Sequence, residues 1–224
     1  MKYGESAFDL IYLAYAIVFV VCILRRRRDA VGKLMGAAVL ILGCGDAFHL
    51  IPRVLNYFLS GDFTAWLGFG KLVTSITMTV FYLLMYRLWL KVYGEKENRA
   101  LSWTVYGLVA LRILLCLLPG NRWLQNDGPA SWGIIRNLPF VALGVVVILL
   151  FYRKRGERRA FRFVWLLVTL SFLFYIPVAV AAGAVPMLGM LMLPKTVCYM
   201  LLIRAFWKEA KAAENHEPNQ KRGA

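Results

Sequence analysis

Residues 10–24 read LIYLAYAIVFVVCIL, and residues 25–28, which follow directly, read RRRR. A soluble helix shows apolar residues on one face only, at intervals of three or four, and this stretch is apolar on all faces. A continuous apolar run that ends in a cluster of arginines is typical of a membrane-spanning helix whose end lies in the cytoplasm. The stretch therefore predicts an integral membrane protein.

The composition of the whole chain of 224 residues agrees with this prediction. Hydrophobic residues make up 60% of it and charged residues 17%, against about 45–50% and about 25% in soluble domains. A chain of this length cannot bury so much apolar surface in a core of its own, so lipid must cover part of it. Collagen, coiled coils, disordered chains and disulfide scaffolds are thereby excluded.

Seven apolar runs are long enough to cross a bilayer, which takes about 20 residues. We place them at residues 8–24, 34–57, 65–87, 101–119, 132–152, 161–183 and 185–207. Their continuous apolarity predicts helices, because a membrane β-strand would alternate apolar and polar residues. The expected fold class is all-α, a single seven-transmembrane-helix bundle over residues 1–207. A polar, disordered cytoplasmic tail is expected over residues 208–224.

The basic residues predict the orientation of the bundle. The chain has 27 lysines and arginines against 12 acidic residues, a formal net charge of +15. Twenty of these cations lie in the tail and around the loops that follow runs one, three and five, whereas six lie toward the opposite side. Since cytoplasmic loops carry the excess of lysine and arginine, we expect the N-terminus outside and the C-terminus inside, in a multi-pass protein of the plasma membrane.

The placement of the charge also bears on partners and cofactors. Cations that follow apolar runs lie at the membrane surface, where each gains about 1 kcal/mol from anionic lipids. We therefore expect membrane lipids as partners and no nucleic acid. The four cysteines all lie inside apolar runs and one of the two histidines is in the tail, so no metal site is expected. No nucleotide or dinucleotide motif is present, and no cofactor is expected.

Run two carries ionisable residues inside the membrane. Asp46, His49 and Arg53 follow one another at intervals of three and four, which places them on one stripe of a helix. An ionisable group at the bilayer centre costs about 2.5–3.5 kcal/mol, so such residues by default mark a functional site. The alternative is a buried pair that only stabilises helix packing.

Run seven contributes Lys195, directly after Pro194 and near the middle of the run. Lys195 and Asp46 would then lie at the same depth, and we expect an ion pair that offsets the cost of inserting both. The alternative is a desolvated catalytic lysine that loses its proton readily. Pro194 is expected to kink the helix. The candidate catalytic residues are Asp46, His49 and Lys195.

Four runs each place one cation in the half that is expected to face outward. If these cations converge, they form a vestibule that attracts a phosphate or carboxylate headgroup, so an anionic amphiphile is a candidate ligand. Hydroxyl groups of neighbouring runs can complete such a site. The alternative is that each cation reaches separately to the outer headgroups. The candidate substrate-binding residues are Arg53, Lys71, Arg112, Arg136, Ser75, Tyr175 and Tyr199.

The segment Gly45-Asp46-Ala47, followed by Leu50 and Pro52-Arg53, resembles the lysoplasmalogenase-like YhhN family of small polytopic membrane proteins. Residues 170–177 and 198–204 look similar to the late helices of that family. The resemblance implies hydrolysis of the vinyl-ether bond of lysoplasmalogens by intramembrane carboxylates. The chain departs from the family in run six, which lacks the second aspartate, so His49 or Lys195 would have to take its role.

Two further classes stay open beside a protein that binds or hydrolyses a lysolipid. A seven-helix receptor or sensor fits the topology, although run three has no carboxylate to act as counterion if Lys195 carried retinal. A transporter or an assembly partner for another membrane protein is compatible with the polar interior. The sequence leaves it open whether the protein is an enzyme.

Overall fold

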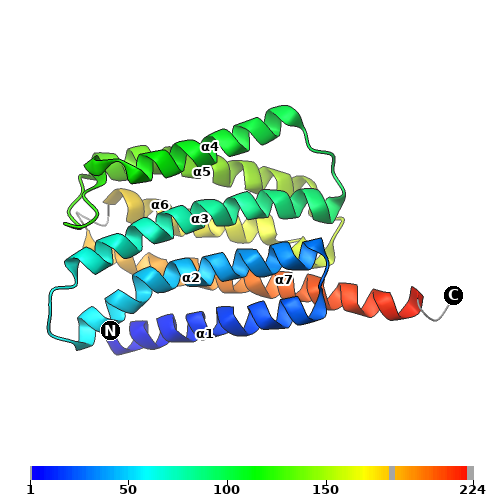
Figure 1. Cartoon of the computed structure of the whole chain (residues 1–224), viewed down its shortest axis with the longest axis horizontal. Helices are drawn as coiled ribbons and strands as arrows, with labels where there is room; N and C mark the ends of the chain where they lie inside the picture. The colour runs from blue at the N-terminus through cyan, green and yellow to red at the C-terminus, as the bar shows by residue number, and fades with distance from the viewer. Residues whose placement is uncertain (1, 182–184, 221–224) are drawn as a thin grey trace.

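The structure, a computed structural model, describes residues 2–181 and 185–220 and shows only helices and loops among them. The described residues form seven long helices, and consecutive helices run in opposite directions, as Figure 1 shows. Their bounds are Lys2–Arg26 (α1), Ala30–Phe58 (α2), Thr64–Tyr93 (α3), Arg99–Leu117 (α4), Ala130–Arg153 (α5), Val164–Ala181 (α6) and Met192–Gln220 (α7). The predicted all-α fold with seven helices long and apolar enough to span a membrane is confirmed.

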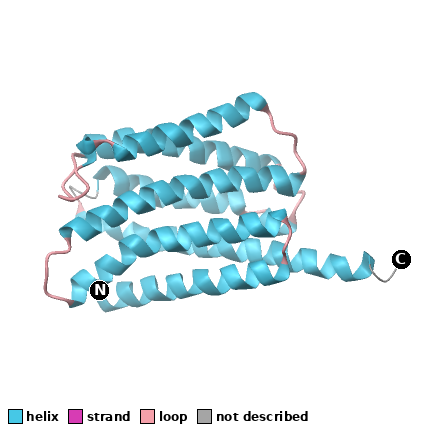
Figure 2. Cartoon of the chain, in the orientation of Figure 1, coloured by secondary structure: helices cyan, strands magenta, loops and turns pink. Residues whose placement is uncertain are grey.

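The helices follow one another around the bundle. Each packs against its neighbours in the sequence, and α7 closes the ring against α1. Short loops join them, as Figure 2 shows, with three 3₁₀ helices at Pro119–Asn121, Arg159–Phe161 and Pro186–Leu191. The N-terminus and the loops after α2 and α4 lie at one end, which we call the N-terminal end. The C-terminus and the loops after α1, α3 and α5 lie at the other, the C-terminal end.

Glycines let α2 and α3 approach each other closely. A Cβ atom at Gly45 would overlap the side chain of Thr77, and one at Gly70 would overlap the backbone of Phe48. The Thr74 hydroxyl donates to the carbonyl of Gly45 at 2.9 Å. Helices in lipid associate through such small-residue contacts, because the hydrophobic effect drives no association there. The contact fixes how α2 and α3 are rotated toward each other.

A buried carboxylate connects the elements of the C-terminal end. Glu209 of α7 is 4% exposed, and its Oε1 lies 3.4 Å from an Arg27 nitrogen and 3.2 Å from an Arg158 nitrogen. Arg158 also donates to the carbonyl of Val92 at 3.3 Å. A buried carboxylate is tolerated only with such partners. Glu209 thereby joins α7 to the loops after α1 and α5 and to the end of α3.

The seventh helix differs most from its prediction. The sequence predicts a span over 185–207 with a kink at Pro194, whereas α7 begins at Met192 and continues to Gln220. Pro194 therefore lies in the first turn, where a proline costs the helix no hydrogen bond. The expected disordered tail is helical up to Gln220, because Glu209 and Ala210 pack into the bundle. The tail residues 221–224 and the last residues of run six, 182–183, lie outside the described residues.

Cysteine labelling tests the orientation, which stays a prediction. In a cysteine-free background, a membrane-impermeant maleimide added to intact cells should label Ser60→Cys at the N-terminal end and spare Lys96→Cys at the C-terminal end. Both residues are exposed in loops, so accessibility alone does not separate them. The physical reason is the excess of lysine and arginine at the C-terminal end. Labelling of Lys96→Cys alone would reverse the orientation.

Replacement of Glu209 tests the role of the C-terminal end. Glu209→Gln should lower the free energy of unfolding by about 1.5–3 kcal/mol, because it removes the buried charge that pairs with Arg27 and Arg158, while Arg27 keeps its ion pair with Asp29. The control is Glu214→Gln in the same helix, whose ion pair with Arg26 is exposed and worth less than about 1 kcal/mol. Thermal unfolding in detergent measures both variants. Equal melting temperatures would show that Glu209 has no special role.

Candidate functional site

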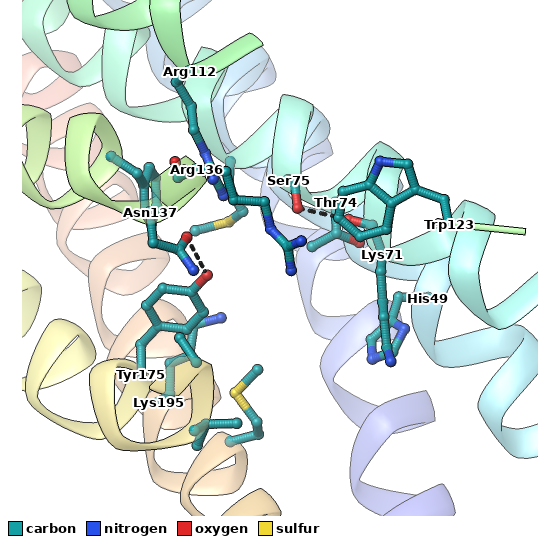
Figure 3. A pocket seen from close by; sticks show the side chains of 15 residues that line it. His49, Lys71, Thr74, Ser75, Arg112, Trp123, Arg136, Asn137, Tyr175 and Lys195 are labelled. Carbon is teal, nitrogen blue, oxygen red and sulfur yellow. Dashed lines mark hydrogen bonds between the residues drawn. The ribbon is translucent and has the colours of Figure 1, made fainter. Parts of the chain in front are cut away.

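A cavity of about 270 Å³ lies inside the bundle, in the half toward the N-terminal end. Every helix except α1 contributes to its wall, together with the loop between α4 and α5. Figure 3 shows the side chains that face it. Seven of the ten candidate residues line the cavity: His49, Lys71, Ser75, Arg112, Arg136, Tyr175 and Lys195.

Arg112 is the most buried cation of the cavity, with 1% of its surface exposed. It belongs to the buried face of α4, which Val105, Val109 and Cys116 also occupy at helical intervals. One guanidinium nitrogen donates to the Arg136 carbonyl, and the Nε atom has no hydrogen-bond partner among the described residues. The guanidinium carbon lies 5.3 Å from the centre of the Phe140 ring. A fully buried arginine without a carboxylate leaves donor capacity for a ligand.

The loop between α4 and α5 positions two more cations. Arg136 donates to the Asn121 side-chain oxygen at 2.8 Å and stacks over the Trp123 ring, with 4.4 Å between the guanidinium carbon and the ring centre. Lys71 donates to the Asn126 side-chain oxygen at 2.6 Å. Asn121 is itself 2% exposed and donates to backbone carbonyls at the end of α4. The loop therefore forms part of the site.

Three residues of this loop were not among the predicted site residues: Asn121, Trp123 and Asn126. They belong to no apolar run, and the order of residues in a loop does not show that it folds back over a cavity. The available signal is an aromatic residue flanked by two asparagines in the longest loop, which is weak.

Lys195 completes the cation set from the first turn of α7. Its ammonium lies 5.0 Å from the centre of the Tyr175 ring and 5.5 Å from that of Tyr199. The Tyr175 hydroxyl donates to the Asn137 side-chain oxygen at 2.8 Å, as the dashed line in Figure 3 marks. Asn137 in turn donates to the carbonyl of Gly133. These hydrogen bonds link α6 to α5 and fix the position of the Tyr175 ring beside Lys195.

The predicted direct ion pair between Asp46 and Lys195 does not form, because the two charged groups are not within 4.0 Å of each other, but they lie close enough to interact electrostatically. The Asp46 carboxylate accepts a hydrogen bond of 2.7 Å from the Tyr12 hydroxyl instead. The Asp46 side chain therefore faces α1. His49, one turn further, does line the cavity, and its Nδ1 is buried without a partner among the described residues.

Two other candidates lie outside the cavity. Arg53 forms an ion pair of 2.7 Å with Glu5 of α1 and a hydrogen bond with Tyr57, so it is neutralised at the surface of the N-terminal end. Tyr199 is 3% exposed and hydrogen-bonds with the Tyr82 hydroxyl at 3.3 Å. The Tyr199 ring therefore lies near the Lys195 ammonium without lining the cavity.

A second buried acid, Asp9 of α1, was not among the predicted site residues. Asp9 is 4% exposed, and its Oδ2 has no hydrogen-bond partner among the described residues; the neighbouring Ser6 hydroxyl has none either. The acid lies near the start of the first run, where the sequence resembles an ordinary membrane anchor. The interface of α1 and α2 therefore holds two buried acids, Asp9 and Asp46, neither of which lines the cavity.

The charged side chains that line the cavity are, among the described residues, all positive. Four cationic side chains line it, those of Lys71, Arg112, Arg136 and Lys195, and none of the described lining residues is an aspartate or glutamate. Charges in a membrane interior are normally paired with opposite charges. The arrangement can attract and hold an anion.

The cavity does not assemble the groups of the hydrolytic chemistry that the family resemblance implies. That chemistry needs an acid and a base in hydrogen-bond reach of the bond that breaks. Asp46 lies behind the cavity wall, and the Ser75 hydroxyl donates to the carbonyl of Lys71 rather than to His49. Among the described residues, no group of three histidine, cysteine, aspartate or glutamate side chains is placed to hold a metal ion.

Comparisons with known proteins find no matching family model, no similar curated sequence and no matching solved structure. The resemblance to the YhhN family therefore stays a prediction. The geometry of the cavity alone carries the functional argument.

Removal of the Tyr12 hydroxyl tests how Asp46 is held. Tyr12→Phe should lower the free energy of unfolding by about 1.5–3 kcal/mol, because the Asp46 carboxylate loses a charge-assisted hydrogen bond in a lipid-surrounded interior. The matched control is Tyr106→Phe, whose hydrogen bond to Glu97 is exposed and should change stability by less than about 0.5 kcal/mol. Thermal unfolding in detergent provides the comparison. An unchanged melting temperature of Tyr12→Phe would mean that Asp46 does not depend on this bond.

Proposed function

We propose that this protein binds an anionic amphiphile of the lysolipid type, with the headgroup in the cavity and the chain toward the surrounding lipid. The observation that carries the proposal is the set of four cations without an acid among the described lining residues. A bound anionic headgroup would supply the missing negative charge.

The cost of placing charge in a membrane supports this proposal. An unpaired cation costs up to about 2.5–3.5 kcal/mol at the bilayer centre and less toward the surface, so several cations that face one cavity favour a compensating group. Arg112 in particular cannot reach the headgroup layer, because it is 1% exposed and fixed by the Arg136 carbonyl. A phosphate in the cavity would accept hydrogen bonds from these donors in charge-assisted geometry.

The size and the lining of the cavity favour an amphiphile over a wholly polar anion. Its volume of about 270 Å³ is slightly below the range of about 300–1,000 Å³ for complete small-molecule sites, so it fits a headgroup and the first carbons of a chain. Met78, Phe140, Val178 and Met192 supply an apolar part of the wall. A headgroup among the cations leaves these apolar side chains to contact the first carbons of the chain.

The proposal is one of binding and not of hydrolysis. Asp46, the acid that a lysoplasmalogenase-like reaction would use, is hydrogen-bonded to Tyr12 outside the cavity. The proposal includes the outer leaflet as the source of the ligand, because the cavity lies in the half toward the N-terminal end and the basic residues favour the C-terminal end as the cytoplasmic one.

A binding measurement with purified protein in an uncharged detergent tests this function. Oleoyl lysophosphatidylglycerol, which has one negative charge, should bind at least about tenfold more tightly than monooleoylglycerol, which has the same chain and no phosphate. Arg136→Gln should remove most of that difference, because Arg136 faces the cavity. Arg122→Gln is the matched control, since Arg122 is an exposed residue of the same end outside the cavity lining.

Two results would contradict the proposed function. One is equal binding of the two lipids to the unaltered protein, which would show that the phosphate is not recognised. The other is an equal loss of binding in Arg136→Gln and Arg122→Gln, which would show that only the net charge of the N-terminal end matters.

A further inference from the structure

We infer that the ligand carries a terminal phosphate monoester, as lysophosphatidic acid or another single-chain lipid phosphate does, and not a zwitterionic or diester headgroup. The inference rests on the proposed function and names the headgroup class of the same cavity. Three features of the cavity support it: the positive charge of its lining, the hydrogen-bond donors that face it, and the aromatic rings that already contact cations of the protein.

The charge is the first feature. Lys71, Arg112, Arg136 and Lys195 face the cavity with no acid among the described lining residues, so a ligand with one negative charge leaves most of the positive charge uncompensated. A phosphate monoester carries about −1.5 to −2 at neutral pH, whereas a phosphate diester carries a single charge. The monoester therefore neutralises more of the positive charge that faces the cavity.

The donors are the second feature. Arg136 uses one nitrogen for Asn121 and directs the rest of its guanidinium into the space that Figure 3 shows between the walls, and Arg112 lines the same cavity. Lys195 has no hydrogen-bond partner among the described residues, and its nitrogen lies against two aromatic rings. The three acceptor oxygens of a terminal phosphate can receive bonds from several of these donors at once. A diester has fewer free oxygens, because a second substituent occupies one of them.

The aromatic rings are the third feature, and they argue against a choline or ethanolamine headgroup. Proteins bind such ammonium groups on free aromatic faces. In this cavity Trp123 already stacks with Arg136 at 4.4 Å, Tyr175 lies 5.0 Å from the Lys195 ammonium, and Phe140 lies 5.3 Å from the Arg112 guanidinium. A ligand ammonium would meet four like charges and no carboxylate of the described lining. The cavity thus rejects a cationic headgroup.

Binding to lipids of one chain and different headgroups tests this inference. We expect oleoyl lysophosphatidic acid to bind roughly tenfold more tightly than oleoyl lysophosphatidylglycerol, and oleoyl lysophosphatidylcholine to bind least. Lys71→Met should reduce the preference for the monoester over the diester, because Lys71 lines the cavity; its exposed side chain is outside the buried core, and the substitution removes only its hydrogen bond to Asn126. Arg122→Met, outside the cavity lining, should leave the preference unchanged.

The outcomes separate this inference from the proposed function. Equal binding of the monoester and the diester, both tighter than monooleoylglycerol, would overturn the monoester and leave the anionic site in place. Binding of the choline lipid as tight as that of the monoester would also overturn it. If inorganic phosphate displaced the lipid at concentrations similar to those of lysophosphatidic acid itself, the ligand would be a soluble phosphate, and the lipid assignment would fall. If none of the lipids bound better than monooleoylglycerol, the proposed function itself would be wrong.

Discussion

A charged side chain in the hydrocarbon interior is costly unless it is paired, reaches the surface or faces a polar space, and the placement of charge in this protein follows from that constraint. Arg53 is paired with Glu5 near the surface, and Glu209 is paired with two arginines at the C-terminal end. The cations of the cavity have no such carboxylate among the described lining residues. The cavity therefore differs from these two regions, because no carboxylate of the described lining pairs with its cations.

The two ends of the bundle serve different purposes under this constraint. At the C-terminal end, Glu209 and its arginines join α7 to two loops, so the charge there stabilises the fold. At the N-terminal end, the loop between α4 and α5 folds over the cavity, where Asn121 and Asn126 orient Arg136 and Lys71 without neutralising them. Neutral amides fix the positions of the cations and leave their charge available to a ligand.

The resemblance to the YhhN family favours hydrolysis of a lysolipid, whereas the geometry of the cavity favours binding of a lysolipid without hydrolysis. The resemblance depends on Asp46, which lies at the interface of α1 and α2 with Tyr12. The cavity depends on Lys71, Arg112 and Arg136, which lie outside the segments that carry the resemblance, and on Lys195. The α1–α2 interface also holds the buried acid Asp9, together with the ion pair of Glu5 and Arg53, whereas the described cavity lining contains cations and no acid.

The sequence by itself determined the number of spans and the fold class. A run of about 20 apolar residues matches the thickness of the hydrocarbon layer, and this property depends on the local sequence alone. It also determined that Lys71, Arg112 and Arg136 lie in the same half of the bundle. Only the tertiary structure decided that these cations converge while Arg53 and Asp46 turn away, and that α7 begins at Met192. The reason is that the rotation of each helix about its axis depends on contacts such as that of Gly45 with Thr77. In a helix that is apolar on both its lipid and its core side, periodicity does not reveal that rotation.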